Sequence, residues 1–124
     1  MRRLEAHQTR DAAGLAYDRQ IGIIDRLKRH NLVTRLDVTQ TFVDRCVAEH
    51  VDGKLSAVDA AKAKWWTAEV QNQILDHCVQ LHGGYGFMDE YRVARFWADA
   101  RVSKIWGGTN EIMKDLIGRS MGLG

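Results

Sequence analysis

A glycine pair followed by a polar triplet is the feature of this sequence most able to carry chemistry. Gly107 and Gly108 leave main chain without side chains, which a flat group can approach closely. Thr109, Asn110 and Glu111 follow at a predicted helix start, where free N–H groups and the positive end of the helix dipole favour a phosphate or an electron-rich carbonyl. The pattern therefore predicts a binding site in which bare backbone lies beside hydrogen-bond donors.

A second glycine-rich stretch, QLHGGYGFMDEY at residues 80–91, allows two interpretations. The order Gly83-Gly84-x-Gly86 has the composition of a phosphate-binding loop, but a dinucleotide fingerprint follows a strand and opens a helix. Here the glycines close a long helix-like run, and helix C-termini commonly use glycine. Spacing alone therefore favours a structural helix stop over a phosphate-binding loop.

Other reactive residue types do not form a recognisable catalytic or metal site. His77 and His82 are five apart and lack the intervening glutamate of a zinc-binding HExxH helix. Cys78 follows His77 directly, and adjacent residues on a helix point in different directions. Cys46 and Cys78 are best explained as buried thiols rather than a disulfide or a metal site. We predict no metal ion.

The elements that must position the glycine joints are helices. The chain has 124 residues and no proline, and no two-residue alternation predicts a strand. Ser56, with Asp59 three residues later, predicts the start of a helix over 57–82. A third helix is predicted over 89–105, and a fourth begins with Thr109 or Asn110 as its cap. The prediction is an all-α antiparallel helical bundle with short connections.

The first third of the chain differs from the rest. Residues 1–35 carry eight Lys/Arg and four Asp/Glu, a net charge of +4, and we predict a divergent basic helical segment there. Residues 36–124 form the predicted bundle. The bundle is predicted to open with a helix that ends at the turn Asp52-Gly53. One face of this helix comprises Val38, Phe42, Val43, Cys46 and Val47.

Composition limits the classes of partner and compartment. No apolar run approaches the roughly 20 residues of a membrane span, and the basic start is not followed by the apolar stretch of a secretory signal. The basic charges of residues 1–35 are interleaved with acids, which favours a solvated helix face over nucleic-acid binding. We expect a cytoplasmic location in a bacterium, or another reducing compartment.

Two long motifs resemble the C-terminal helical domain of the flavin-dependent acyl-CoA dehydrogenases. QLHGGYGFMDEYRVARFWADARV and IWGGTNEIMKDLI carry the resemblance, which runs from about Asp37 to Met121 and is most similar to the long-chain-type branch. The resemblance implies that the substrate acyl-CoA borders Gly107 and Gly108. It further implies that FAD, often that of a partner subunit at the first joint, contacts Gln80, Leu81, His82, Gly83, Gly84, Thr109, Asn110 and Glu111.

The resemblance also implies a reaction and partners. In the family, a carboxylate takes the α-proton of a fatty acyl thioester while the β-hydride passes to the flavin. The implied partners are acyl-CoA, a homo-oligomer (dimer or tetramer) or another acyl-CoA dehydrogenase chain, and electron-transfer flavoprotein as the electron acceptor.

Two departures from the family limit the activity expected of this chain. Gly107 stands where many members have the catalytic glutamate, and neither Glu5 nor Glu111 takes its place, so no catalytic residue is assigned. The family's Arg-x-x-Phe-Gly stretch has only a faint echo in residues 19–22. With the base and the middle β-domain missing, we expect the chain alone to be inactive. The alternative function is a non-catalytic helical oligomerisation module derived from the family.

Overall fold

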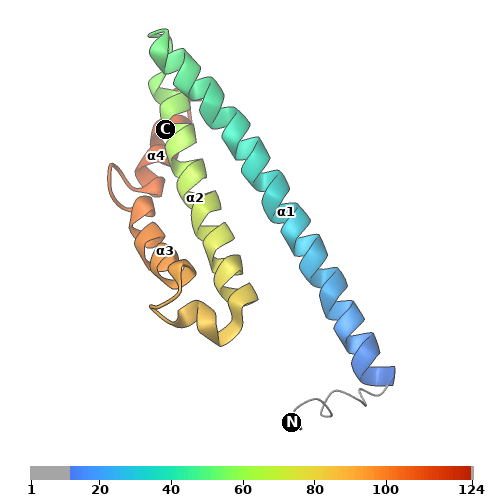
Figure 1. The fold of residues 1–124 in the computed structure, drawn as a ribbon. Helices are drawn as coiled ribbons and strands as arrows, with labels where there is room; N and C mark the ends of the chain where they lie inside the picture. The colour runs from blue at the N-terminus through green and yellow to red at the C-terminus, as the bar shows by residue number, and fades with distance from the viewer. Residues whose placement is uncertain (1–11, 124) are drawn as a thin grey trace. The chain divides into compact units, whose positions relative to one another are not determined.

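The structure, a computed structural model, describes the backbone of residues 12–123 and the side chains of residues 31–123. All regular elements in this part are helical, which confirms the predicted all-α class (Figure 1). In chain order they are α1 (Ala12–Val51), α2 (Ala57–His82), the 3₁₀ helix η1 (Gly83–Phe87), α3 (Arg92–Ala100), the 3₁₀ helix η2 (Arg101–Lys104) and α4 (Asn110–Ser120).

Two compact units divide the chain, one over Met1–Thr34 and the other over Arg35–Gly124. Helix α1 runs through the boundary between them. Both glycine joints lie in the second unit, and the packing described below is that of residues 35–123.

The start and end of α2 follow from local sequence. The Ser56 side chain accepts a hydrogen bond from the backbone N–H of Asp59 at 3.0 Å, which satisfies one of the free donors at the helix start. Gly83, with φ of 61°, closes the helix in a conformation that side chains disfavour. The predicted bounds of residues 57–82 and the predicted cap are therefore confirmed.

The face that α1 buries is rotated from the predicted one. Thr39 and Cys46 are buried, whereas Val38 and Val47 are exposed, so the prediction that both valines share the packed face was wrong. Trp66 of α2 donates its indole N–H to the Thr39 hydroxyl at 3.0 Å. This hydrogen bond lets a polar threonine lie at the packed face.

The predicted single helix over 89–105 is interrupted. It begins at Arg92 and tightens into η2 after Ala100. The carbonyl of Ala100 accepts hydrogen bonds from the Ser103 hydroxyl at 2.6 Å and from the Asn72 amide at 3.0 Å. These side chains compete for the carbonyl that a continuing α-helix would use.

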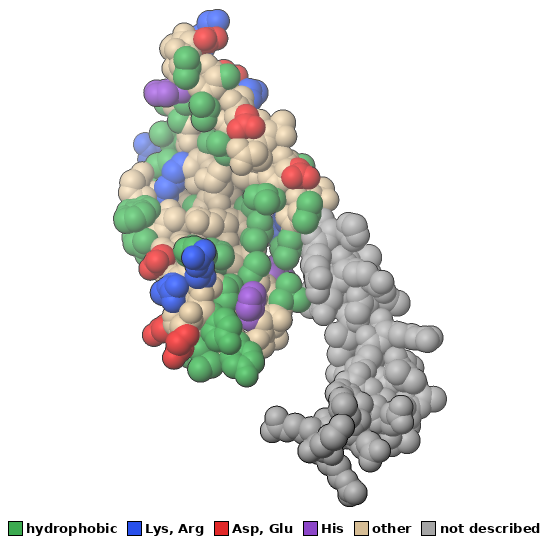
Figure 2. Space-filling model, viewed as in Figure 1, with side chains coloured by type: hydrophobic (Ala, Val, Ile, Leu, Met, Phe, Trp, Pro, Cys, Tyr) green, Lys and Arg blue, Asp and Glu red, His purple; other side chains and the backbone are tan. Residues whose placement is uncertain are grey.

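Small residues make up most of the core of the second unit. The buried hydrophobic positions among the described residues are Cys46, Ala61, Ala68, Val70, Ala94 and Ala100. Figure 1 shows α3 and α4 beside α2, and the alanines allow these helices to approach closely. Many large apolar side chains remain exposed, and Figure 2 shows patches of hydrophobic side chains on the face in view. Among the described helices, none combines the length and apolarity that a bilayer crossing requires.

Candidate cofactor-binding site

The first joint presents bare main chain to solvent. Gly83 and Gly84 are exposed, and a Cβ atom added to either would meet nothing within 4 Å. Gln80, Leu81 and His82 precede them at the exposed end of α2, and the His82 ring nitrogen Nδ1 lies 2.7 Å from the carbonyl oxygen of Cys78. The backbone here is open to a group that lies flat against it.

Gly86 has a different role from its two neighbours in the motif. It is buried, and an added Cβ would lie 2.4 Å from the backbone oxygen of Val79 in α2. The close approach of η1 to α2 therefore requires glycine for packing. The predicted structural interpretation of the motif, a glycine helix stop, applies to Gly83, which closes α2, whereas the packing role of Gly86 was not predicted. Gly83 and Gly84 also have open space beside their backbone.

The second joint is anchored by a lysine from α2. Gly107 and Gly108 adopt φ values of 63° and 94°, and Gly107 is exposed. The Lys64 ammonium donates a hydrogen bond to the carbonyl of Gly108, 44 residues away. Sequence reasoning missed Lys64, because no local pattern links it to a carbonyl so far along the chain.

The polar triplet uses much of its hydrogen-bonding capacity on itself. The Thr109 hydroxyl accepts from the backbone N–H of Ile112 at 3.3 Å and so caps α4. Hydrogen bonds from its own backbone N–H and from the Thr109 side chain lower the pKa of the Glu111 carboxyl. A general base needs a pKa near neutrality, so this environment does not suit Glu111 for proton abstraction.

Asn110 is the polar residue of the triplet that has no partner. Only 3% of it is exposed, and neither its amide nitrogen nor its amide oxygen hydrogen-bonds to another described residue. Buried amides are normally paired. Asn110 therefore carries unused donors and an unused acceptor at the start of α4, which fits a polar group arriving at this joint.

The two joints lie far apart within one chain. Lys64, which contacts Gly108, precedes His82 by 18 residues on the same helix, so the joints are separated by about 27 Å along α2. The structure thus keeps the residues of each joint together but does not bring the two joints into one pocket.

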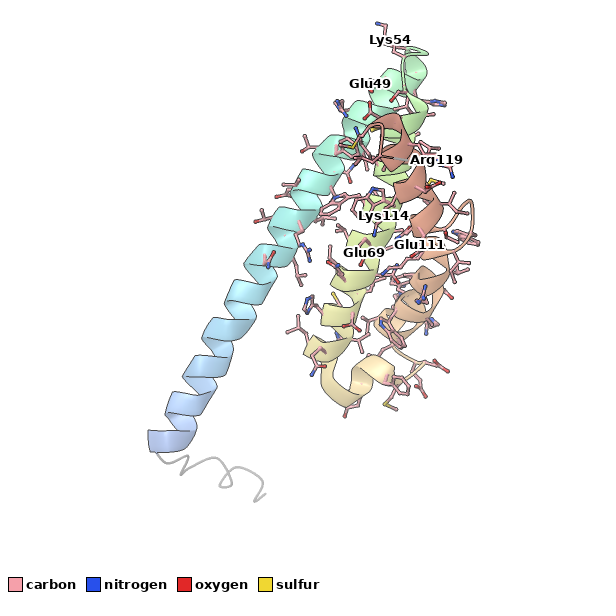
Figure 3. The ribbon with its side chains drawn as sticks, turned by 180° about the vertical axis from the view of Figure 1, so that it is seen from behind. Glu49, Lys54, Glu69, Glu111, Lys114 and Arg119 are labelled. Atoms are coloured by element: carbon pink, nitrogen blue, oxygen red, sulfur yellow. The ribbon has the colours of Figure 1, made fainter. Side chains whose placement is uncertain are left out.

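An ion pair supports the helix between the joints. Lys104 of η2 lies 3.0 Å from the Glu69 carboxylate on α2, and the Gln73 amide donates to the same carboxylate at 3.0 Å. Figure 3 marks Glu69 on α2 and Lys114 on the adjacent α4. The hydrogen bond from Lys104 is the main cause that lowers the pKa of Glu69, and Gln73 adds to it against the effect of burial.

The Glu69 pair predicts a dependence of stability on pH. Because the folded-state pKa of Glu69 is lowered, its contribution is complete above its ordinary pKa of 4.5 and is lost as pH falls through the folded value. We expect Glu69→Gln to lower the free energy of unfolding by about 1 kcal/mol at pH 7, with the difference from wild type shrinking below about pH 4.5. Denaturant titrations at several pH values measure this.

The control for Glu69 is the solvent-exposed pair of Asp115 and Arg119, in which both side chains are more than half exposed. Asp115→Asn should change stability by less than about 0.5 kcal/mol, because exposed pairs are screened. A pH-independent difference between Glu69→Gln and wild type would contradict the assignment.

Two grooves among the described residues contain neither glycine joint. One, of about 660 Å³, lies between α2 and α3 beside Asp76, Trp97 and Arg101. The other, of about 760 Å³, is largely apolar and includes Val70, Ile74 and Trp106. Within the described part of the chain, no group of three His, Cys, Asp or Glu could hold a metal ion.

Comparison with known proteins extends the motif resemblance. The family model of the acyl-CoA dehydrogenase C-terminal domain matches residues 6–122. The match therefore covers the two motifs and also extends upstream of Asp37. The pig (Sus scrofa) mitochondrial long-chain specific acyl-CoA dehydrogenase is 50% identical over 94 residues, which cover 76% of this chain and 22% of that protein. The chain therefore spans about a fifth of the length of this relative.

Solved structures agree with the sequence relatives. An acyl-CoA dehydrogenase from Geobacillus kaustophilus superimposes with a TM-score of 0.76 at 41% identity, covering 77% of this chain and 25% of that one. The FAD complex of PigA gives a TM-score of 0.69 at 28% identity, covering 95% of this chain and 30% of that one. The helical fold, the two glycine motifs and the domain match together show that this chain belongs to the acyl-CoA dehydrogenase family, whose C-terminal domain it represents.

Proposed function

We propose that this chain supplies FAD and acyl-CoA contacts to an enzyme that removes two hydrogens from the α and β carbons of a fatty acyl-CoA thioester. Membership of the family supports the reaction. The observation that carries the cofactor assignment is the exposed main chain of Gly83 and Gly84, where no atom lies within 4 Å of an added Cβ. A flat phosphorylated ring system can lie against such a surface without displacing a side chain.

The residues of the two joints would hold different ends of the cofactor. We assign the adenosine and pyrophosphate end to the first joint, formed by Gln80, Leu81, His82, Gly83 and Gly84. Thr109, Asn110 and Glu111 would meet FAD at the start of α4. Because the joints are about 27 Å apart along α2, one FAD would meet the second joint of one chain and the first joint of its partner.

The chemistry of the reaction divides between cofactor and protein. FAD supplies the hydride acceptor when bound. Gly107 and Gly108 would border the acyl-CoA, with the open space at Gly107, because an added Cβ at Gly108 would lie 2.5 Å from the Met113 methyl group. Lys64 holds this backbone by its bond to the Gly108 carbonyl. Position 107 offers no carboxylate, and the lowered pKa of Glu111 does not suit it as the base. The base of the reaction is therefore assigned to none of these residues.

The same proposal implies an electron acceptor and a cellular compartment. Electrons would pass from FAD to electron-transfer flavoprotein, and the thiols of Cys46 and Cys78, which are free in the structure, suit a reducing compartment such as the bacterial cytoplasm.

Flavin titration tests the cofactor assignment. We expect the protein to quench FAD fluorescence saturably, and Gly84→Ala to weaken binding about tenfold, because a methyl group would separate the flat ligand from the backbone. Gly84 does not need a positive φ and has open space around it, so the variant should fold normally.

Gly118→Ala is the matched control for the flavin titration. An added Cβ there makes only an ordinary contact, 3.7 Å from the Leu123 carbonyl oxygen, far along α4 from either joint. Its FAD affinity should equal that of wild type. Equal affinities of Gly84→Ala and wild type, or no binding by wild type, would refute the assignment.

A second function, as a non-catalytic oligomerisation module, is favoured by the exposed apolar side chains. Tyr85, Phe87 and Trp106 are 61%, 76% and 65% exposed. Apolar surface of this kind on a folded chain commonly marks a surface that another protein covers. Self-association without FAD binding would support this function over the enzymatic one.

A further inference from the structure

We propose that Lys64 is a positioning residue of the second joint: its bond to the Gly108 carbonyl polarises the Gly108–Thr109 peptide and makes the Thr109 N–H the main hydrogen-bond donor to an incoming acceptor oxygen. The inference deepens the proposed function and rests on it for the identity of the ligand, a polar oxygen of FAD. The effect of Lys64 on the peptide belongs to the ligand-free protein and can be measured without FAD.

The backbone donors at the start of α4 are mostly in use. The first four N–H groups of a helix have no carbonyl acceptor within the helix. The N–H of Ile112 donates to the Thr109 hydroxyl at 3.3 Å, and that of Glu111 donates to its own carboxylate, which is the main cause of the lowered pKa of this group. The N–H groups of Thr109 and Asn110 have no acceptor among the described residues. These two donors remain for a ligand.

Burial selects between the two remaining donors. Only 3% of Asn110 is exposed, whereas Thr109 is half-buried and follows the exposed Gly107 by two residues. A ligand that lies against the bare backbone of the second joint therefore meets the Thr109 N–H more readily than the Asn110 N–H.

The Thr109 N–H belongs to the same peptide unit as the Gly108 carbonyl, to which Lys64 donates its hydrogen bond. Hydrogen bonds from a charged donor are stronger than those from a neutral one. Hydrogen-bonded groups also polarise one another, so a bond at the carbonyl strengthens the N–H at the other end of the peptide. Lys64 is half-buried, which reduces the screening of its charge by water. The Thr109 N–H is thus a stronger donor than an unassisted backbone N–H.

The polarised peptide is also fixed in place. Gly108 has φ of 94°, and an added Cβ would lie 2.5 Å from the Met113 methyl carbon of α4. Lys64 contacts the same residue from α2. A donor that two helices hold in position needs no reorganisation when an acceptor arrives.

A second lysine provides the matched comparison. Lys114 of α4 lies 4.8 Å from the centre of the Trp65 ring, next to Lys64 in the sequence of α2, and Figure 3 shows it on the same helix as Glu111. Among the described residues, Lys114 makes no hydrogen bond to the backbone of the joint. A general effect of positive charge would be shared by both lysines, whereas polarisation through the Gly108 carbonyl is specific to Lys64.

Amide resonances of the ligand-free protein test the polarisation. We expect Lys64→Met to move the Thr109 amide proton and nitrogen resonances upfield by more than any other amide in residues 107–113, because methionine has a similar length but no charge and no donor. Lys64→Arg should keep most of the wild-type shift, and Lys114→Met should leave it unchanged. An unaltered Thr109 resonance in Lys64→Met, or an equal change in Lys114→Met, overturns the proposal.

FAD titration of the same proteins tests the consequence for binding. Lys64→Met should bind FAD about tenfold more weakly than wild type, Lys64→Arg should stay within about threefold, and Lys114→Met should match wild type. FAD added to wild type should shift the Thr109 amide more than the Ile112 amide, whose N–H is already bonded. This comparison within wild type decides the proposal even where Lys64→Met does not fold.

The outcomes separate this proposal from the proposed function. If wild type does not bind FAD, the cofactor assignment fails, and the ligand-free spectra still decide whether Lys64 polarises the peptide. If FAD binds but shifts Ile112 as much as Thr109, or binds Lys64→Met as tightly as wild type, the role of Lys64 is refuted and flavin binding stands.

Discussion

Gly86→Ala is expected to lower the free energy of unfolding by at least about 3 kcal/mol. The added Cβ would lie 2.4 Å from the backbone oxygen of Val79 and 3.0 Å from its carbonyl carbon and Cα. These atoms belong to the α2 backbone, which cannot rotate away as a side chain can. The clash can be relieved only by moving η1 off α2. Thermal and urea denaturation should show the loss, with a midpoint roughly 10 °C lower.

Gly84→Ala is the control for this result, because it introduces the same methyl group two residues earlier, where the space is open. It should change stability by no more than about 1 kcal/mol. A Gly86→Ala protein as stable as the Gly84→Ala protein would mean that η1 does not pack against α2 as described.

Asn72→Leu should produce the second largest loss, about 2 kcal/mol. The Asn72 amide nitrogen contacts the carbonyl oxygens of Ala68 at 2.7 Å and Ala100 at 3.0 Å, and the Ser103 hydroxyl at 3.2 Å. Leucine keeps a similar volume but provides no donor. The largest local effect is expected where α3 turns into η2, and hydrogen exchange of the amides of Ile105 and Trp106 should accelerate most.

Gln71→Leu places the same residue on the neighbouring, exposed position of α2 and should be close to neutral. If Asn72→Leu and Gln71→Leu are equally stable, the hydrogen bonds from α2 to the end of α3 contribute nothing measurable. If exchange rises uniformly across the bundle, Asn72 supports the whole fold rather than this junction.

Local signals in the sequence were sufficient to predict α2. The Ser56 cap, the absence of proline and glycine over 57–82, and the glycine stop at Gly83 are each determined by residues close to one another in the chain. The cap of α4 by Thr109 follows from the same kind of signal.

Features that depend on tertiary contacts were not predictable in this way. The break at Ala100 depends on Asn72, which is 28 residues away, and the anchoring of Gly108 depends on Lys64. The face of α1 was misjudged because Thr39 is buried through its bond to Trp66, while apolar Val38 and Val47 stay exposed. In each case a partner distant in sequence overrides a local preference.

The candidate site combines features that local sequence predicts with features that depend on tertiary contacts. Residue types indicated that Gly83, Gly84 and Gly107 expose backbone, and the open space around each agrees with that expectation. The binding of FAD and acyl-CoA at these residues stays a prediction. No spacing rule could show that Asn110 is buried without a partner, because burial depends on how α4 packs on α2.

The unbroken course of α2 has a consequence for how an assembled enzyme would be built. A helix of 26 residues without glycine or proline resists bending and stretching, so it fixes the distance and the rotation between its two ends. Inserting one residue between Lys64 and His82 would lengthen α2 by about 1.5 Å and turn its far end by about 100°. In the proposed function, the two joints that this helix connects would then lose their relative orientation, even though every residue at either end is unchanged.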